Sequence, residues 1–122
     1  MIHFQTTKTN QDDSTIIVEV QGQLTEATRE EFYESVNEKV DEGFSRIILD
    51  CDGLGMLSSG GMAALMVARK RARQKSVKLY LTCVNSVLSE LLEQTKLGKI
   101  FSIFPSTEGL MEQLRDGALA AT

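Results

Sequence analysis

Residues 46–66 of the chain read RIILDCDGLGMLSSGGMAALM, and this stretch decides the fold. Its first part is a short apolar run with a charge before it and Asp and Gly after it, a pattern that predicts a buried strand over residues 44–51. From Met62 onward the sequence is rich in Ala, Leu and Met, which favour a helix. The turn between them contains Ser58 and Ser59, and either hydroxyl can cap the helix by accepting a hydrogen bond from an N–H group of its first turn.

This turn is also where we expect function. Unpaired N–H groups and the helix dipole favour negative charge at the start of a helix. A strand that ends where a serine-capped helix begins therefore forms a small, exposed site that favours anions.

The composition limits the classes of protein to consider. The 122 residues are 42% hydrophobic and include one proline, which suits a single globular domain with one core. No apolar run approaches the roughly 20 residues that cross a bilayer, and the polar segment 1–13 lacks the apolar region of a signal peptide. We therefore expect a cytoplasmic protein. Its net charge of −4 and its pI near 5.0 argue against binding to nucleic acid or to an anionic membrane.

The sequence has few cysteine and histidine residues that could bind a metal ion, form a disulfide or act as a catalytic base. Cys51 and Cys83 alone cannot build a disulfide framework or a metal site, so we expect two buried thiols rather than a redox switch. His3 is the only histidine and falls on an expected edge strand, where it is poorly placed for a catalytic triad. We therefore expect no cofactor, no metal and no enzymatic activity.

The first part of the chain predicts a hairpin followed by a helix. Residues 2–9 alternate weakly and residues 15–20 are rich in β-branched side chains, so we expect two antiparallel strands joined by a turn at 10–13. Thr25 is an expected N-cap of a helix that Gly43 ends. The expected buried face of this helix consists of Phe32, Val36 and Val40.

The rest of the chain alternates helix and strand. The helix after Ser59 ends in the basic run 69–75, whose cations suit the C-terminal end of a helix better than a nucleic-acid site. We then expect strands over 77–82 and 100–104, with a helix between them and another after the second. The expected caps of these two helices are, in order, Asn85 or Ser86, and Ser106.

Together these elements predict an α/β fold. Two strands come first, and helices and strands then alternate, which implies a mixed sheet covered by helices. A crossover through a helix makes each later strand parallel to its neighbour, whereas the N-terminal hairpin is antiparallel. We expect about five strands and about four α-helices in a single domain over residues 1–116, with a flexible tail over 117–122.

The sequence resembles the STAS domain family over nearly its whole length, from Ile2 to Arg115. The segments that carry the resemblance are Gly-Gln-Leu at 22–24, Ile-Ile-Leu-Asp at 47–50, Ser-Ser-Gly at 58–60 with the helix that follows, and Val-Lys-Leu-Tyr-Leu at 77–81. The resemblance implies the fold shared by anti-sigma factor antagonists and the cytosolic tails of sulfate transporters. As a free-standing domain of this size, the sequence resembles the antagonists rather than a transporter tail.

The resemblance also implies a function. In this family the first serine of the Ser-Ser-Gly turn is the phosphoacceptor, which here is Ser58. The implied partner is an anti-sigma factor with a histidine-kinase-like serine kinase fold, which binds the unphosphorylated antagonist and is released when it phosphorylates that serine. We expect the antagonist to be a monomer or a weak dimer. The expected switch loop and docking surface consists of Thr25, Met56, Leu57, Ser59, Gly60, Gly61 and Met62, with Met56 and Leu57 as exposed apolar side chains.

Two other functions stay open. The family usually has an aspartate at the positions of Leu57 and Thr25, so the alternative is a STAS module without phosphotransfer, which serves as a scaffold or as a subunit of a larger signalling or lipid-transport assembly. An enzyme with Ser58 as its nucleophile would need a base that the sequence does not offer. Thr82 and Ser86 are weaker candidates for the phosphoacceptor.

Overall fold

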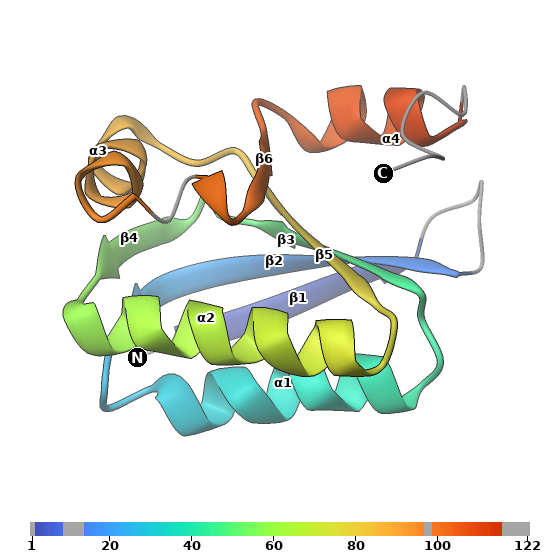
Figure 1. Ribbon diagram of the computed structural model, residues 1–122, viewed down its shortest axis with the longest axis horizontal. Coiled ribbons are helices and arrows are strands. Elements are labelled where there is room, and N and C mark those ends of the chain that lie inside the picture. Colours follow the sequence, from blue (N-terminus) through green and yellow to red (C-terminus); the bar gives the residue numbers. More distant parts are fainter. Residues whose placement is uncertain (1, 9–13, 97–98, 116–122) are drawn as a thin grey trace.

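The computed structural model describes residues 2–8, 14–96 and 99–115, which form one sheet with helices packed on it (Figure 1). The strands are β1 (Ile2–Lys8), β2 (Thr15–Leu24), β3 (Arg46–Asp50), β4 (Leu54–Leu57), β5 (Lys78–Thr82) and β6 (Ser102–Phe104). The helices are α1 (Arg29–Asp41), α2 (Ser59–Gln74), α3 (Ser86–Gln94) and α4 (Thr107–Arg115). The expected turn at 10–13 and the expected tail at 117–122 lie outside the described residues.

The sheet is mixed, as predicted. β1 and β2 form an antiparallel hairpin, and the other neighbours in the order β1-β2-β3-β5-β6 are parallel. With the four α-helices of the described residues, this arrangement confirms the predicted α/β fold. β4 was not predicted, because four residues that include a glycine are too few to display the alternation of a strand. It pairs in parallel with the C-terminal end of β2.

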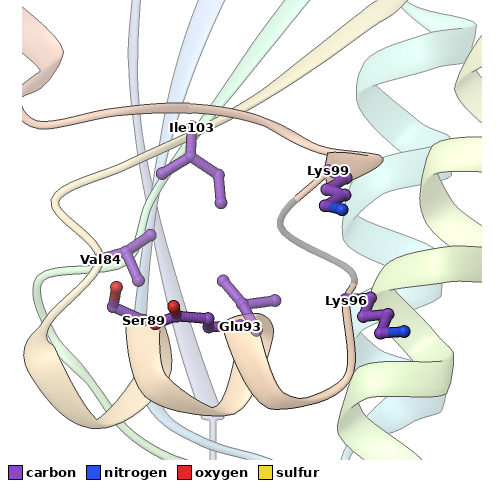
Figure 2. A pocket seen from close by; sticks show the side chains of 7 residues that line it. Val84, Ser89, Glu93, Lys96, Lys99 and Ile103 are labelled. Atoms are coloured by element: carbon purple, nitrogen blue, oxygen red, sulfur yellow. The ribbon is translucent and has the colours of Figure 1, made fainter.

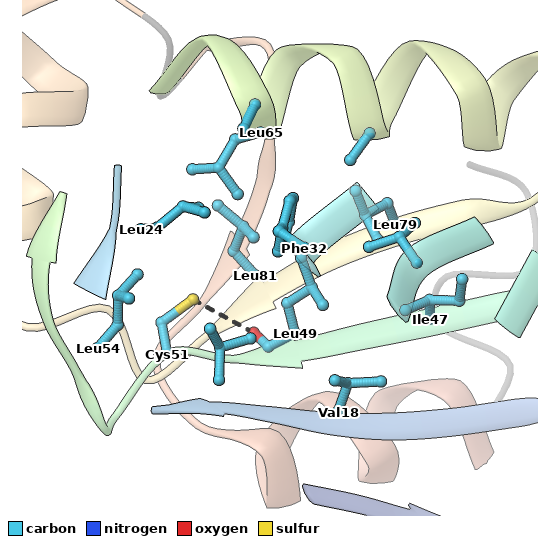
Figure 3. Close-up of a cluster of buried hydrophobic side chains, with 14 of the residues drawn as sticks. Val18, Leu24, Phe32, Ile47, Leu49, Cys51, Leu54, Leu65, Leu79 and Leu81 are labelled. Carbon is cyan, nitrogen blue, oxygen red and sulfur yellow. Dashed lines mark hydrogen bonds between the residues drawn. The ribbon is translucent and has the colours of Figure 1, made fainter. Parts of the chain in front are cut away.

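Helices cover both faces of the sheet. α1 and α2 lie side by side over one face, and α4 lies over the other (Figure 1). In β3, the side chains of Ile47 and Leu49 join the large core under α1 and α2 (Figure 3), whereas Ile48 joins the smaller cluster with Leu110 of α4. Because a strand covered on both sides buries every side chain, its sequence is a continuous apolar run rather than an alternating one.

Helix α1 begins later than predicted. Thr28, not Thr25, precedes its first residue, Arg29. The Thr28 hydroxyl donates to the Gln23 carbonyl at 2.8 Å and accepts from the Thr25 N–H at 3.0 Å. These bonds hold a turn between β2 and α1, because a hydroxyl side chain can bond to nearby backbone in place of helical hydrogen bonds. Gly43 follows the end of the helix as expected, with a φ of 93°.

The caps of the last two helices agree with the sequence. Asn85 Oδ1 accepts from the Leu88 N–H at 3.0 Å, and Ser106 Oγ accepts from the Gly109 N–H at 3.0 Å. Asn85 Nδ2 also donates to the Leu54 carbonyl at 3.1 Å, which ties the start of α3 to β4. Within the described residues, no helix has both the length and the apolar character needed to cross a bilayer.

Both cysteines are free thiols. Cys51 is 3% exposed, and burial, followed by the nearby Asp50 and Cys83, raises its pKa to about 12. Such a thiol stays protonated at neutral pH, and its Sγ donates to the Leu49 carbonyl at 3.6 Å (Figure 3). Cys83 is only half-buried. The expectation of two buried thiols is therefore confirmed for Cys51 and wrong for Cys83.

Candidate functional site

The expected functional turn lies where β4 gives way to α2. β4 runs beside the end of β2, with Leu57 opposite Leu24, and the Ser58 N–H donates to the Leu24 carbonyl at 3.1 Å. The first turn of α2 is therefore held against the residues that follow β2. This places Ser58 next to the turn that leads into α1.

Ser58 is the N-cap of α2. Its backbone is extended, with φ −88° and ψ 174°, and its Oγ accepts a hydrogen bond from the Gly61 N–H at 3.1 Å. This decides between the two serines that the sequence offered as caps, because Ser59 is the first helical residue and is exposed. Ser58 itself is half-buried.

A carboxylate occupies the start of this helix. The Ser58 hydroxyl donates to Glu26 Oε2 at 3.2 Å, and the Gly60 N–H donates to Glu26 Oε1 at 3.0 Å. The anion that the helix start favours is therefore a side chain of the protein itself. Glu26 could not be predicted as part of the site from the sequence, because it lies 32 residues before Ser58 and no local pattern links the two.

These contacts change the acidity of Glu26. Its pKa is lowered, first by its own backbone N–H and then by the Ser58 hydroxyl, the Gly60 N–H and the charge of Arg29, although some desolvation opposes them. The Glu26 side chain is exposed to solvent. Glu26 is therefore a negatively charged group at neutral pH and a weak base.

Two glycines let the helix approach this closely. A Cβ atom on Gly61 would overlap the Leu24 carbonyl, and one on Gly60 would overlap the Glu26 carboxyl group. Gly61 also lies against the Leu57 side chain. Gly61 is therefore a packing requirement of the contact between α2 and the end of β2, whereas the Glu26 side chain that lies against Gly60 is flexible and could move aside.

The predicted docking residues divide into two groups. Met56, which is 48% exposed, and Ser59 lie at the surface, and Thr25 and Gly60 are half-buried. The expectation that Leu57 is exposed beside Met56 is wrong: its side chain is 8% exposed, because it packs under the first turn of α2. The other buried members of the predicted set are Gly61 and Met62.

The other candidates from the sequence lie apart from this turn. Thr82 is 0% exposed, and its hydroxyl is 2.6 Å from that of Thr107, so it is inaccessible to a kinase. Ser86 is exposed, and His3 is exposed on the edge strand β1, opposite Gln21. Among the residues that the structure describes, no cluster of three or more His, Cys, Asp or Glu side chains could hold a metal ion.

A pocket lies elsewhere, between α3 and β6 (Figure 2). Its volume is about 270 Å³, and Val84 and Ile103 give it apolar walls. Glu93, Lys96 and Lys99 also line it, so it offers charges of both signs and selects no class of ion. None of its lining residues belongs to the Ser58 turn.

The close approach of α2 predicts that Gly61→Ala destabilises the fold. The added methyl group would overlap a backbone carbonyl that cannot rotate away, so the free energy of unfolding should fall by about 1–3 kcal/mol. Gly55→Ala is the matched control, because a Cβ there meets only the Gly22 carbonyl at 3.8 Å. Urea unfolding followed by circular dichroism measures both variants. Equal stability of the two would contradict the packing described for Gly61.

Comparison with known proteins agrees with this fold. The sequence model of the STAS domain matches residues 6–110. BtrV, a candidate anti-sigma factor antagonist of Bordetella bronchiseptica, is 28% identical over 96 residues, which cover 79% of this chain and 83% of BtrV. An anti-sigma factor antagonist from Mycobacterium paratuberculosis has a similar structure, with a TM-score of 0.80 at 16% identity over 94% of this chain and 95% of that one.

The Bacillus protein SpoIIAA also has this fold and has been solved in two states. Its unphosphorylated form has a TM-score of 0.73 at 15% identity, over 93% of this chain and 97% of SpoIIAA. Its phosphorylated form has a TM-score of 0.68 at 15% identity, over 93% of this chain and 100% of SpoIIAA. At such identities the structures support the fold alone. Because the family's sequence model spans residues 6–110, this chain belongs to the STAS domain family.

Proposed function

We propose that this domain is an anti-sigma factor antagonist with Ser58 as its phosphoacceptor. In this proposal the unphosphorylated domain binds an anti-sigma factor that is also a serine kinase, and phosphorylation releases that partner. The observation that carries the proposal is the contact between the Ser58 hydroxyl and the Glu26 carboxylate, at 3.2 Å. Membership of the STAS family and the description of BtrV as an antagonist support the general role.

The Glu26 contact orients the hydroxyl for phosphoryl transfer. In that step Ser58 Oγ attacks the γ-phosphorus of ATP, a new O–P bond forms, the bond to ADP breaks, and the hydroxyl proton leaves to a base. Because the Ser58 proton points to Glu26, a lone pair of Oγ is free to face the incoming phosphorus. Glu26 is a positioning residue here, since its lowered pKa makes it a poor acceptor of the proton itself.

Phosphorylation would break this contact. The product has no hydroxyl proton to donate and carries roughly −1.5 to −2 charge at neutral pH, beside a carboxylate that is already negative. Like charges at hydrogen-bond distance repel, and the helix start favours only one of them. We therefore expect the phosphate to displace Glu26 from the Gly60 N–H and to turn it outward.

This change would alter the surface that the partner contacts. The docking surface in this proposal contains Ser58, Ser59, Met56 and the neighbouring Thr25. A kinase that buries this surface would meet a dianion and a displaced carboxylate where it had desolvated a hydroxyl. A tenfold loss of affinity requires only about 1.4 kcal/mol, so one modified side chain is enough to release the partner.

Glu26 lies next to one of the two positions at which the family usually has an aspartate and this sequence does not. Thr25 stands where the family usually has an acid, and the next residue supplies a carboxylate to the same serine. Leu57, at the other position where the family usually has an aspartate, supplies none, because its side chain is apolar, and it is buried as well. That missing acid favours a second candidate function, a STAS module that binds a partner constitutively as a scaffold or subunit. In either case we propose a regulatory binding module in the cytoplasm, monomeric or weakly dimeric, without enzymatic activity.

Incubation with a candidate anti-sigma kinase and ATP tests the proposal. We expect intact mass to rise by one phosphate for the wild-type domain and to stay unchanged for Ser58→Ala, while both bind the kinase in the absence of ATP. Ser59→Ala is the matched control and should still accept phosphate. If the wild-type protein binds the kinase but takes no phosphate, the constitutive scaffold becomes the better account.

A second prediction needs no kinase. Ser58→Glu places a second carboxylate beside Glu26, so it should lower the melting temperature in the wild-type background by several degrees and by less in a Glu26→Gln background. Glu30→Gln removes the same charge from an exposed position in the first turn of α1 and should give no such relief. Thermal unfolding of the single and double variants measures this coupling.

The coupling should also depend on pH. Because the pKa of Glu26 is lowered in the folded state, its contribution to stability is present above the ordinary pKa of 4.5 and is lost as the pH falls through the lowered value. In Ser58→Glu the hydroxyl that helps to lower this pKa is absent and a like charge faces Glu26, which favours protonation of one of the two carboxyl groups. The repulsion should therefore fade as the pH falls toward the range in which carboxyl groups ordinarily titrate. A penalty that is independent of both Glu26 and pH would mean that only the lost cap matters.

A further inference from the structure

The C-terminal end of α2 carries more positive charge than the helix dipole explains. Six of the chain's 13 Lys and Arg residues fall within residues 69–78, and no Asp or Glu occurs between Asp52 and Glu90. Only Arg71 and Arg73 lie in the last turn of α2, where cations complement the dipole. Arg69 and Lys70 precede that turn, and Lys78 lies on the next strand, β5.

These cations differ from Lys39, which forms ion pairs within the domain. Lys39 pairs with Glu38 and Glu42, whereas none of the six cations at 69–78 forms an ion pair with another described residue. Arg71 faces a groove between α1 and α2 that Glu30 and Glu34 also line, so acidic side chains are close to it. Arg69, Lys70, Arg73 and Lys78 have no such neighbours among the described residues that line the hollows beside them, and Lys75 lines neither hollow.

Two adjoining hollows lie between these cations. One, of about 260 Å³, is lined by Arg69, Arg73 and Lys78 together with apolar side chains that include Ile100. The other, of about 510 Å³, is lined by Met66, Val67 and Lys70 and shares Arg69 and Arg73 with the first. No carboxylate of a described residue lines either hollow. We use the name basic surface for the side chains that line these two hollows and carry the argument: Met66, Val67, Arg69, Lys70, Arg73 and Lys78.

The first hollow also lies at an open edge of the sheet. β6 joins β5 only from the pair of Tyr80 with Ser102 onward, so among the described residues Lys78 and Leu79 have β3 on one side and no paired strand on the other. The Lys78 N–H donates to the Ser45 carbonyl at 3.0 Å, on the β3 side. Because successive residues of a strand direct their amides to opposite sides, the Leu79 amide faces the open edge. The hollow thus combines cationic and backbone hydrogen-bonding groups.

We propose that the basic surface is a second docking site, which binds an acidic amphipathic segment of a protein partner. Carboxylates of such a segment would pair with Arg69, Arg73 and Lys78, and guanidinium groups suit carboxylates because they can donate two parallel hydrogen bonds. Apolar side chains of the segment would cover Met66 and Val67, which is 47% exposed. Unpaired cations beside an exposed apolar groove are complementary to that combination of charge and hydrophobicity.

The same features disfavour a nucleic acid or an anionic membrane. The domain has a net charge of −4, which repels polyanions outside this surface. Met66 and Val67 cannot stack on bases, and the ring of Tyr80, which lines the first hollow, packs against Phe104 at 5.8 Å between ring centroids. An acidic protein segment uses both the charges and the apolar groove.

The proposed docking site does not depend on the proposed function of Ser58. Residues 58 and 73 lie at opposite ends of α2 (Figure 1), and 15 residues at 1.5 Å each separate them by roughly 22 Å. That distance exceeds the Debye length of about 8 Å at physiological ionic strength. Binding at the basic surface should therefore be the same in the Ser58→Glu variant as in the wild-type protein.

The test uses a synthetic peptide of about four helical turns with Glu on one face and Leu on the other. We expect calorimetry to detect binding of this peptide. In NMR spectra the peptide should shift the amide signals of Arg69, Arg73 and Leu79, but not those of Ser59 and Gly60. Arg69→Glu combined with Arg73→Glu should weaken binding by about tenfold or more. Arg71→Glu combined with Lys75→Glu changes the net charge equally at the same helix end and should weaken it by about threefold or less.

Several outcomes would overturn the proposal. Equal weakening by the two double variants would mean that only net charge matters. Equal or tighter binding of a duplex DNA, or of vesicles containing phosphatidylserine, would identify a general polyanion site. If the peptide does not bind at millimolar concentration, the basic surface does not bind acidic amphipathic segments and the proposal is wrong. Thermal unfolding of each variant ensures that the comparison is made on folded protein.

Discussion

The hydrogen bonds of Glu26 to the start of α2 are the contact on which the site depends. The carboxylate accepts from the Ser58 hydroxyl and from the Gly60 N–H, and it reaches them because Gly60 and Gly61 let the helix lie against the end of β2. β4, the turn before α1 and the Gly-Gly pair all serve this close approach. A helix start that usually attracts an external anion is here occupied by an internal one.

This arrangement gives the serine two properties at once. Its Oγ caps α2, which stabilises the fold, and its proton is directed to a group whose charge would oppose a phosphate. Modification of Ser58 would therefore exchange one anion for another at the same N–H groups, rather than add an anion to an empty site. The fold can accept that exchange, because Glu26 is at the surface and can move into solvent.

Most of the fold could be predicted from the sequence, whereas the decisive contact could not. The run of Ile47, Ile48 and Leu49, the Ser58 turn and the Ala- and Leu-rich helix are local patterns, and local patterns predicted β3, α2 and the serine cap between them. β4 was too short to predict. Glu26 was missed and Leu57 was placed at the surface, because both depend on how β2 and α2 pack against each other, which no single segment encodes.

A structure of the domain with phosphoserine incorporated at position 58 during synthesis tests the central claim most directly, and it requires no kinase. The account predicts a phosphate oxygen within hydrogen-bond distance of the Gly60 nitrogen and the Glu26 carboxylate turned into solvent. A structure in which Glu26 still accepts the Gly60 N–H, with the phosphate directed elsewhere, would contradict it.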